Sequence, residues 1–123
     1  MIEYQVVEGV PATEMPDLYR RADVVLDQFR IGTYGVAACE AMAVGRLVVS
    51  HADDQVRARA SEARGMALPI VQATPDSLRD VLTDVVARRE HFRSIAALGP
   101  TFVEDLHDGA ASARALAGFL GRA

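Results

Sequence analysis

Short apolar runs alternate with helix-like patterns along the first part of this chain of 123 residues. Runs with apolar, often β-branched centres predict strands, and they are Tyr4 to Glu8, Asp23 to Asp27, Leu47 to Ser50 and Ala67 to Val71. Runs of this kind are typical of parallel strands that are covered on both faces. Their alternation with helices predicts a parallel sheet with right-handed crossovers.

Helix start and stop signals lie between these strands. Thr13 is expected to cap a short helix that has Pro16 in its first turn. An alanine-rich helix is expected from Tyr34 to Val44, where Gly45 ends it in the usual position after the last helical turn. These two predicted helices lie between predicted strands, as an alternating α/β pattern requires.

Helices continue to the end of the chain. A polar helix is expected from the cap at residues 51 to 54 as far as Arg64, with Gly65 as its stop. Residues 74 to 77 combine a threonine cap with proline and an acid, and they start a helix that runs to Arg89. The tail from His91 to Leu120 is predicted to be helical with breaks at Gly99-Pro100 and near Asp108-Gly109.

The pattern as a whole predicts an α/β fold. We expect a Rossmann-like parallel sheet of about four strands, with helices on both faces and a helical C-terminal tail. Residues 1 to 123 form one domain, with βα units over 1 to 72 and the tail over 73 to 123. Because a complete doubly wound domain normally has five or six strands, we expect the chain to correspond to the latter part of one.

Composition excludes several classes of protein. The net charge of −4 argues against nonspecific nucleic-acid binding. No apolar run approaches the ~20 residues of a membrane span, and the N-terminal residues are not expected to be a secretion signal. The single cysteine, Cys39, cannot form an internal disulfide, which favours a cytoplasmic location. All 13 basic residues are arginines, so no lysine is present for a P-loop, a Schiff base or a phosphoryl-receiver site.

One segment carries the candidate chemistry, a glycine-flanked loop followed by a helix with one carboxylate. Gly32 and Gly35 allow close approach to a ligand, and the free N–H groups of the next helical turn favour a phosphate. Glu40 lies about six residues into that helix, roughly 9 Å along its axis. A carboxylate there could accept hydrogen bonds from ribose hydroxyls, although a solvated glutamate is common on such helices.

Two phrases carry a resemblance to a known family: MPDLYRRADVVL from Met15 to Leu26, and YGVAACEAMAVGRLVV from Tyr34 to Val49. Their order and spacing, with the helical tail, resemble the second half of the C-terminal domain of GT-B glycosyltransferases. The family is the large retaining one that uses nucleotide-diphosphate sugars, the family 4 or group 1 type. The likeness extends from residue 4 to about residue 120 and covers part of a full enzyme.

By this resemblance the donor site is built around Glu40, which would hold the ribose hydroxyls. The family carries two glutamates separated by seven residues, and Glu40 corresponds to the second. Gly32 stands where the first glutamate contacts the donor sugar. Asp27 or Gln28, at the end of the preceding strand, could supply the missing polar contact.

The resemblance also implies the remaining site residues. Gly32, Thr33, Tyr34 and Gly35 would bind the donor sugar and diphosphate. The loop with Val10 and Ala12 would border the nucleobase. No cofactor and no metal are expected, and the nucleotide sugar is the ligand.

In an intact enzyme the implied reaction is transfer of a sugar to an acceptor hydroxyl with retention, in glycan or glycoconjugate biosynthesis. Such an enzyme would be cytoplasmic, peripheral to the inner face of the membrane. The family's diphosphate-binding arginine–lysine pair and its N-terminal acceptor domain have no counterpart here. The isolated chain is therefore expected to be inactive and to need that domain or a partner chain, and its exposed sheet edges favour self-association.

Two alternative interpretations remain open. The first is a noncatalytic nucleotide-binding or interaction module, either a relic or a subunit that a partner chain completes. The second is a nucleotide-sugar epimerase of the same fold. An upstream coding segment of transferase type would support the glycosyltransferase, and one of epimerase type would support the epimerase. The absence of such a segment would support the module.

Other candidate residues have structural explanations. His51, Asp53 and Asp54 are metal-ligand types at close spacing, but a polar helix start explains them better than a metal site. Cys39 is expected to be a small buried residue. The stripe of Leu116, Phe119 and Leu120 is interpreted as core or as a surface that packs on a missing domain.

Overall fold

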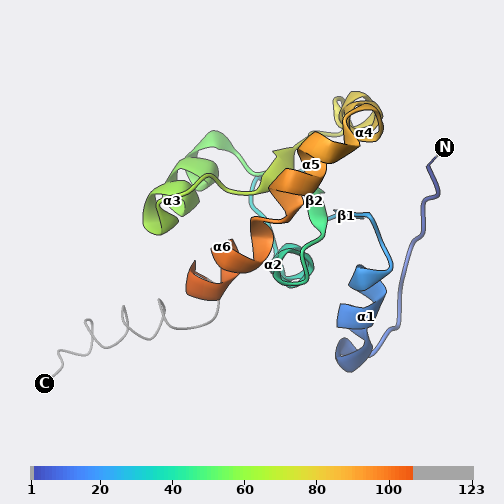
Figure 1. Cartoon of the computed structure of the whole chain (residues 1–123). Helices are drawn as coiled ribbons and strands as arrows, with labels where there is room; N and C mark the ends of the chain where they lie inside the picture. Colours follow the sequence, from blue (N-terminus) through green and yellow to red (C-terminus); the bar gives the residue numbers. More distant parts are fainter. Residues whose placement is uncertain (1, 107–123) are drawn as a thin grey trace, which may run out of the picture.

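Three short parallel strands form the centre of the structure, with helices around them (Figure 1). The computed structural model describes residues 2 to 106. In chain order the elements are η1 (Ala12–Glu14), α1 (Met15–Arg20), β1 (Val24–Leu26), α2 (Val36–Ala43), β2 (Leu47–Ser50), α3 (Asp54–Arg64), β3 (Ile70–Gln72), α4 (Leu78–Ala87), α5 (Arg89–Ala96) and α6 (Gly99–Leu106). The α/β class and the parallel sheet are confirmed.

The strands lie in the order β1-β2-β3, and both neighbouring pairs are parallel. Every residue of the central strand β2 is buried, whereas the residues of β1 are half-buried. Val25 pairs with Val48, and Val48 pairs with Ile70 across the sheet. Because side chains alternate along a strand, these three lie on one face of the sheet.

Helices cover both faces of the sheet, as the sequence predicts. The face with Val48 and Ile70 belongs to the larger core cluster, which includes Ala38 and Met42 of α2 and Phe102 of α6. The opposite face packs against α4 and α5 through a second cluster. Figure 1 shows α4 and α2 on opposite sides of the strands.

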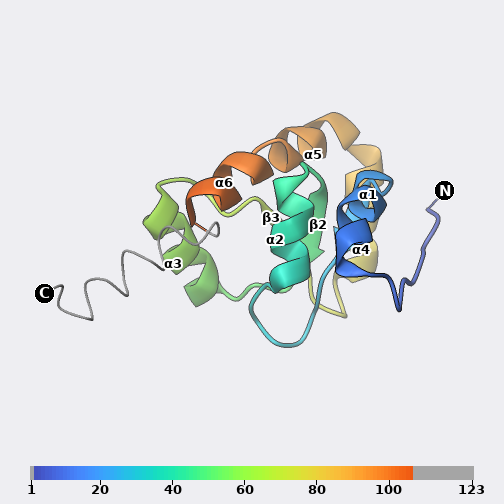
Figure 2. The same cartoon turned by 90° about the horizontal axis from the view of Figure 1, so that it is seen from below.

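The C-terminal part of the described chain returns to the first face. Figure 2 shows α6 continuing from α5 across α2 toward α3, and α6 packs directly on α2. The crossing is close at Gly99: a Cβ atom there would stand 2.6 Å from the Met42 carbonyl oxygen and 3.0 Å from its Cα. The sequence predicts a helix break at Gly99-Pro100, and the break lies just before it, at residues 97 and 98 between α5 and α6. Gly99 is the first residue of α6, where it permits the close helix contact.

The predicted strand from Tyr4 to Glu8 is wrong. Residues 2 to 8 belong to no helix or strand, and Figure 1 shows them as an extended segment apart from the sheet. Tyr4 and Val6 are 70% and 68% exposed. A strand needs a neighbour for its backbone hydrogen bonds, and the described part of the chain offers this segment none. The sheet therefore has three strands among residues 2 to 106, not four.

The predicted cap at Thr13 is also wrong. Thr13 lies inside the single turn η1, and α1 begins at Met15 after Glu14. Pro16 does lie in the first turn of α1, where its missing N–H costs no helical hydrogen bond. With the turn η1 in front of it, the helix starts one residue later than a cap at Thr13 would place it.

Other helix ends agree with the sequence. Asp53 caps α3 by accepting a hydrogen bond from the Val56 N–H at 2.9 Å. Gly45 and Gly65 follow α2 and α3 with φ angles of +75° and +73°. The predicted break near Asp108-Gly109 and the stripe with Leu116, Phe119 and Leu120 lie outside the described residues.

Candidate functional site

The carboxyl ends of β1 and β2 are joined to the start of α2 by Asp27. Its Oδ2 accepts hydrogen bonds from the Ser50 hydroxyl and from the Gly35 N–H, each at 3.0 Å. Ser50 is fully buried at the end of β2. The carboxyl ends of the strands and the first turn of α2 are therefore held together, at the edge where open α/β sheets bind ligands.

Gln28 organises the loop that follows β1. Its side-chain oxygen accepts hydrogen bonds from the Arg30 and Ile31 N–H groups at 3.0 and 2.7 Å. Its side-chain nitrogen donates to the carbonyl of His51 at 2.7 Å and to that of Thr33. The oxygen and the nitrogen of the Gln28 amide are thus both hydrogen-bonded to backbone groups. A contact from this side chain to a donor sugar stays a prediction.

Gly32 occupies a position that only glycine fits easily. Its φ angle is +88°, and it is buried against the start of α3. The Asp53 N–H donates to the Gly32 carbonyl at 2.8 Å. A Cβ atom at Gly32 would lie 3.1 Å from Oδ2 of Asp53. Glycine here is a conformational requirement, because side chains rarely adopt this φ and Asp53 takes the adjacent space.

Sequence reasoning missed the relation between Gly32 and Asp53. Asp53 lies in the next βα loop, and its distance along the chain concealed how near its carboxylate comes to position 32. Its Oδ1 caps α3, while Oδ2 is directed at the Gly32 backbone. The signal that could have found it is the capping pattern at residues 51 to 54, which fixes Asp53 at the end of β2.

An open groove of about 730 Å³ lies between α2 and α3. Three of the predicted donor-site residues are at this groove: Thr33, Tyr34 and Gly35. The opposite wall comes from α3 and includes Arg59 among small and apolar side chains. The groove therefore has the start of α2 on one side and the Arg59 guanidinium on the other. The sequence pattern does not distinguish Arg59 from the other surface arginines.

Glu40 faces α1 across a hydrogen bond. Its Oε2 accepts from the Tyr19 hydroxyl at 3.0 Å. Tyr19 is a buried core residue, whereas Glu40 is exposed. Burial, with the hydrogen bond to Glu40 and its negative charge, raises the pKa of Tyr19 to about 12. Burial also raises the pKa of Tyr34 to about 12.

These two phenols make stability depend on pH above 10. In the unfolded chain they ionise near the ordinary value of 10.0, and in the folded chain near 12. Between these pH values the unfolded state binds fewer protons than the folded state. The contribution of the two phenols to the free energy of unfolding is therefore fully present below pH 10 and is lost as the pH rises to 12. Denaturant titrations across this range measure the loss, and Tyr19→Phe is expected to remove its share. Ionisation of both phenols near pH 10 in the folded chain would contradict the prediction.

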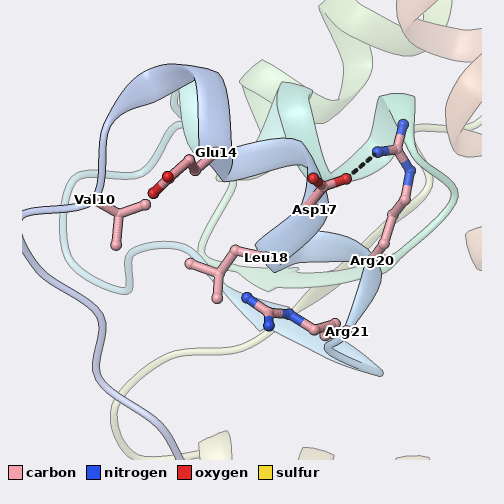
Figure 3. A pocket seen from close by; sticks show the side chains of 6 residues that line it. All are labelled: Val10, Glu14, Asp17, Leu18, Arg20 and Arg21. Atoms are coloured by element: carbon pink, nitrogen blue, oxygen red, sulfur yellow. Dashed lines mark hydrogen bonds and ion pairs between the residues drawn. The ribbon is translucent and has the colours of Figure 1, made fainter.

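A second hollow, of about 610 Å³, lies beside α1 (Figure 3). Val10, predicted to border a nucleobase, lines it together with Leu18 and Arg21. Figure 3 shows the Val10 and Leu18 side chains on the same side of the α1 ribbon. Ala12 starts the turn η1 and is not part of this lining.

The metal-ligand types at the start of α3 have other partners. Asp53 caps the helix, and Nδ1 of His51 is hydrogen-bonded to the side-chain nitrogen of Gln72 at 2.7 Å. Among residues 2 to 106, no three His, Cys, Asp or Glu side chains come together in a group that could hold a metal ion. Within the same residues, no helix has the length and apolar character needed to cross a membrane.

Comparisons of the chain with family models, with curated proteins and with solved structures found no match.

Proposed function

We propose that this chain is the donor-binding portion of a retaining GT-B glycosyltransferase, which transfers a sugar from a nucleotide-diphosphate sugar to an acceptor hydroxyl. The observation that carries the proposal is the edge where β1, β2 and the first turn of α2 meet. Thr33, Tyr34 and Gly35 line a groove there, and the Asp53 carboxylate lies next to Gly32. These are the elements that a sugar diphosphate needs: amide donors, a cation and a carboxylate.

The diphosphate would bind at the start of α2. Gly35 caps this helix without a side-chain hydrogen bond to the first turn, so the amide groups of that turn can donate to phosphate oxygens. Arg59 faces the same groove from α3 and would add a charge-assisted hydrogen bond. Together they would neutralise the charge that develops on the leaving nucleotide.

Asp53 is our candidate for the carboxylate that contacts the donor sugar. Its Oδ2 lies 3.1 Å from the point where a side chain at position 32 would begin. The resemblance assigns a glutamate to that position, where this chain has glycine. A carboxylate that arrives from the start of α3 could serve the same sugar hydroxyls, with Asp27 engaged by Ser50 and Gly35.

Glu40 would bind the ribose hydroxyls. Tyr19 donates to one of its carboxylate oxygens and so orients the side chain, while the other oxygen can accept from a ligand. The apolar wall of Val10 and Leu18 beside α1 would border the base. In this arrangement α2 carries the contacts to both the diphosphate and the ribose.

Glu40→Ala is expected to weaken UDP or GDP binding about tenfold, because hydrogen bonds to a charged group are lost. Isothermal titration calorimetry of the full chain with UDP and with GDP measures the change. Glu90→Ala is the matched control, since Glu90 is an exposed residue of α5. Unchanged affinity in Glu40→Ala would rule out the ribose role, and failure of both nucleotides to bind would rule out the proposed function.

A further inference from the structure

The groove between α2 and α3 is continuous with the larger core cluster. Ala60 belongs to that cluster, and Val56 and Cys39 pack against it from the same two helices. All three also line the groove, together with Val36, which is 74% exposed. The apolar interior between the two helices therefore reaches the surface along this groove.

The wall that α3 contributes has the spacing of a helix-packing face. Val56, Ala60 and Ala63 are four and three residues apart, so they lie on one face of the helix. Two of them are alanines, and Gly35 and Cys39 on the α2 side are also small. Small side chains on two neighbouring helices leave room for large side chains of a third. The groove therefore suits an apolar helix face with large side chains.

The last described helix brings the chain close to this groove. α6 packs on both α2 and α3, and the Thr101 carbonyl accepts a hydrogen bond from the Arg64 side chain at 3.4 Å. Figure 2 shows α6 crossing α2 toward α3. Residues 107 to 123 follow α6 along the chain. A helix over residues 110 to 120 would be about 16 Å long, and the wall from Val56 to Ala63 extends about 10 Å along α3, so the segment is long enough to cover it.

The sequence of that segment complements the groove. Leu116, Phe119 and Leu120 form an apolar stripe at helical spacing, and Arg114 falls on the opposite face of the same helical pattern. The stripe supplies large side chains where the groove has small ones. The predicted break near Asp108-Gly109 separates such a helix from α6 and allows the chain to turn back toward the groove.

We propose that residues 110 to 120 form a helix that seats Leu116, Phe119 and Leu120 in the groove between α2 and α3 of the same chain. Burial of these side chains, and of the exposed Val36, drives the docking. The proposal does not rest on the proposed function. Because Thr33 and Arg59 line the same groove, a docked tail and a bound diphosphate would compete for it.

Cys39 offers a direct test, because it lines the groove and is the only cysteine of the chain. A second cysteine is introduced into the full chain by Ala113→Cys, Leu116→Cys or Leu120→Cys, each on the stripe face. Arg114→Cys on the opposite face is the matched control. Under mild oxidation at low protein concentration, we expect at least one of the three to form an intrachain disulfide about tenfold faster than the control, because the bond requires Cα atoms within about 7 Å.

Non-reducing electrophoresis and mass spectrometry of the linked peptides measure these rates and identify the bond. Equal rates in all four variants would show that the tail does not seat in the groove. Disulfide-linked dimers in place of the intrachain bond would assign the groove to a second copy of the chain and overturn docking within one chain.

The reactivity of the Cys39 thiol tests the same docking without a second cysteine. Phe119→Asp is expected to raise its rate of modification by a thiol reagent about tenfold, because loss of a buried aromatic side chain releases the tail from the groove. Gly118→Asp is the control, since it adds the same charge at the neighbouring position on the opposite face. An unchanged rate in Phe119→Asp would overturn the proposal.

The outcomes separate the docking from the proposed function. If a stripe cysteine bonds to Cys39 and neither UDP nor GDP binds, the docking stands and the proposed function fails. If UDP binds in a manner that depends on Glu40 and no stripe cysteine reacts faster than Arg114→Cys, the docking fails and the proposed function stands.

Discussion

Gly99→Ala is expected to lower the free energy of unfolding by about 3 kcal/mol, the upper end of the usual cost of overpacking. The new Cβ would stand 2.6 Å from the Met42 carbonyl oxygen and 3.0 Å from its Cα. Both are backbone atoms of α2, so the clash is relieved only if one helix moves away from the other. Because alanine is a better helix former than glycine, a loss of stability would run against helix propensity.

Equilibrium unfolding in denaturant measures this loss, followed by far-ultraviolet circular dichroism. Gly35→Ala makes the same chemical change at a site where the new Cβ meets only the Asp27 side chain at 3.6 Å, an ordinary contact. Gly35 caps α2 and alanine is a poorer cap, so we expect that control to lose about 1 kcal/mol at most, well below the loss at Gly99. Equal stability of the two variants would show that α6 does not pack on α2 at the distance described.

Phe102→Ala is expected to cost about 4 kcal/mol, because it removes a large side chain from a close-packed interior. Phe102 is 0% exposed and lies in the core cluster with Met42 and Val48. A loss of that size is a large part of the roughly 5–15 kcal/mol that stabilises a typical domain. The variant could therefore be partly unfolded without denaturant.

Phe102→Leu keeps the measurement possible in that case, since it preserves most of the apolar volume and should cost about 1.5 kcal/mol. Val36→Ala is the surface comparison, because Val36 is 74% exposed and its removal should change stability by less than about 0.5 kcal/mol. Thermal and denaturant unfolding of the three variants give the order. A Phe102→Ala variant as stable as Val36→Ala would contradict the assignment of Phe102 to the core.

Local signals predicted most of the elements correctly. Asp53 was expected at the start of a polar helix and caps α3, and Gly65 ends that helix with a φ angle of +73°. The runs at Leu47 and near Val24 form the strands β2 and β1. Caps, glycine stops and apolar runs act over a few residues, so the sequence reveals them without knowledge of the rest of the fold.

Long-range relations could not be predicted in the same way. The run around Val6 has the composition of a strand, but a strand also needs a neighbour, and the pattern does not say whether one is present. Gly99 next to proline predicts a break, and only the approach of α2 explains why glycine is needed there. In both cases the deciding contact comes from a distant part of the chain.

In the candidate site, too, local features could be predicted from the sequence and long-range contacts could not. The sequence places the loop with Thr33 and Gly35 at the carboxyl end of a strand, where the structure has it, while its role in binding stays a prediction. The proximity of Asp53 to Gly32, the link between His51 and Gln72, and Arg59 in the groove were not predicted. Each of these contacts connects residues of different βα units. The relative position of such units depends on how their strands pair, which the local sequence does not reveal.

The position of β2 between two short strands has a consequence for how the structure opens. Its residues are covered on both faces and bonded on both sides, whereas β1 and β3 each have one side without a neighbouring strand among the described residues. Amide protons of β2 should therefore exchange with solvent last, through opening of the whole domain, while those of the outer strands exchange through smaller fluctuations. Ser50 lies at the end of β2, so the polar contacts at the sheet edge are anchored to the slowest-opening part of the molecule.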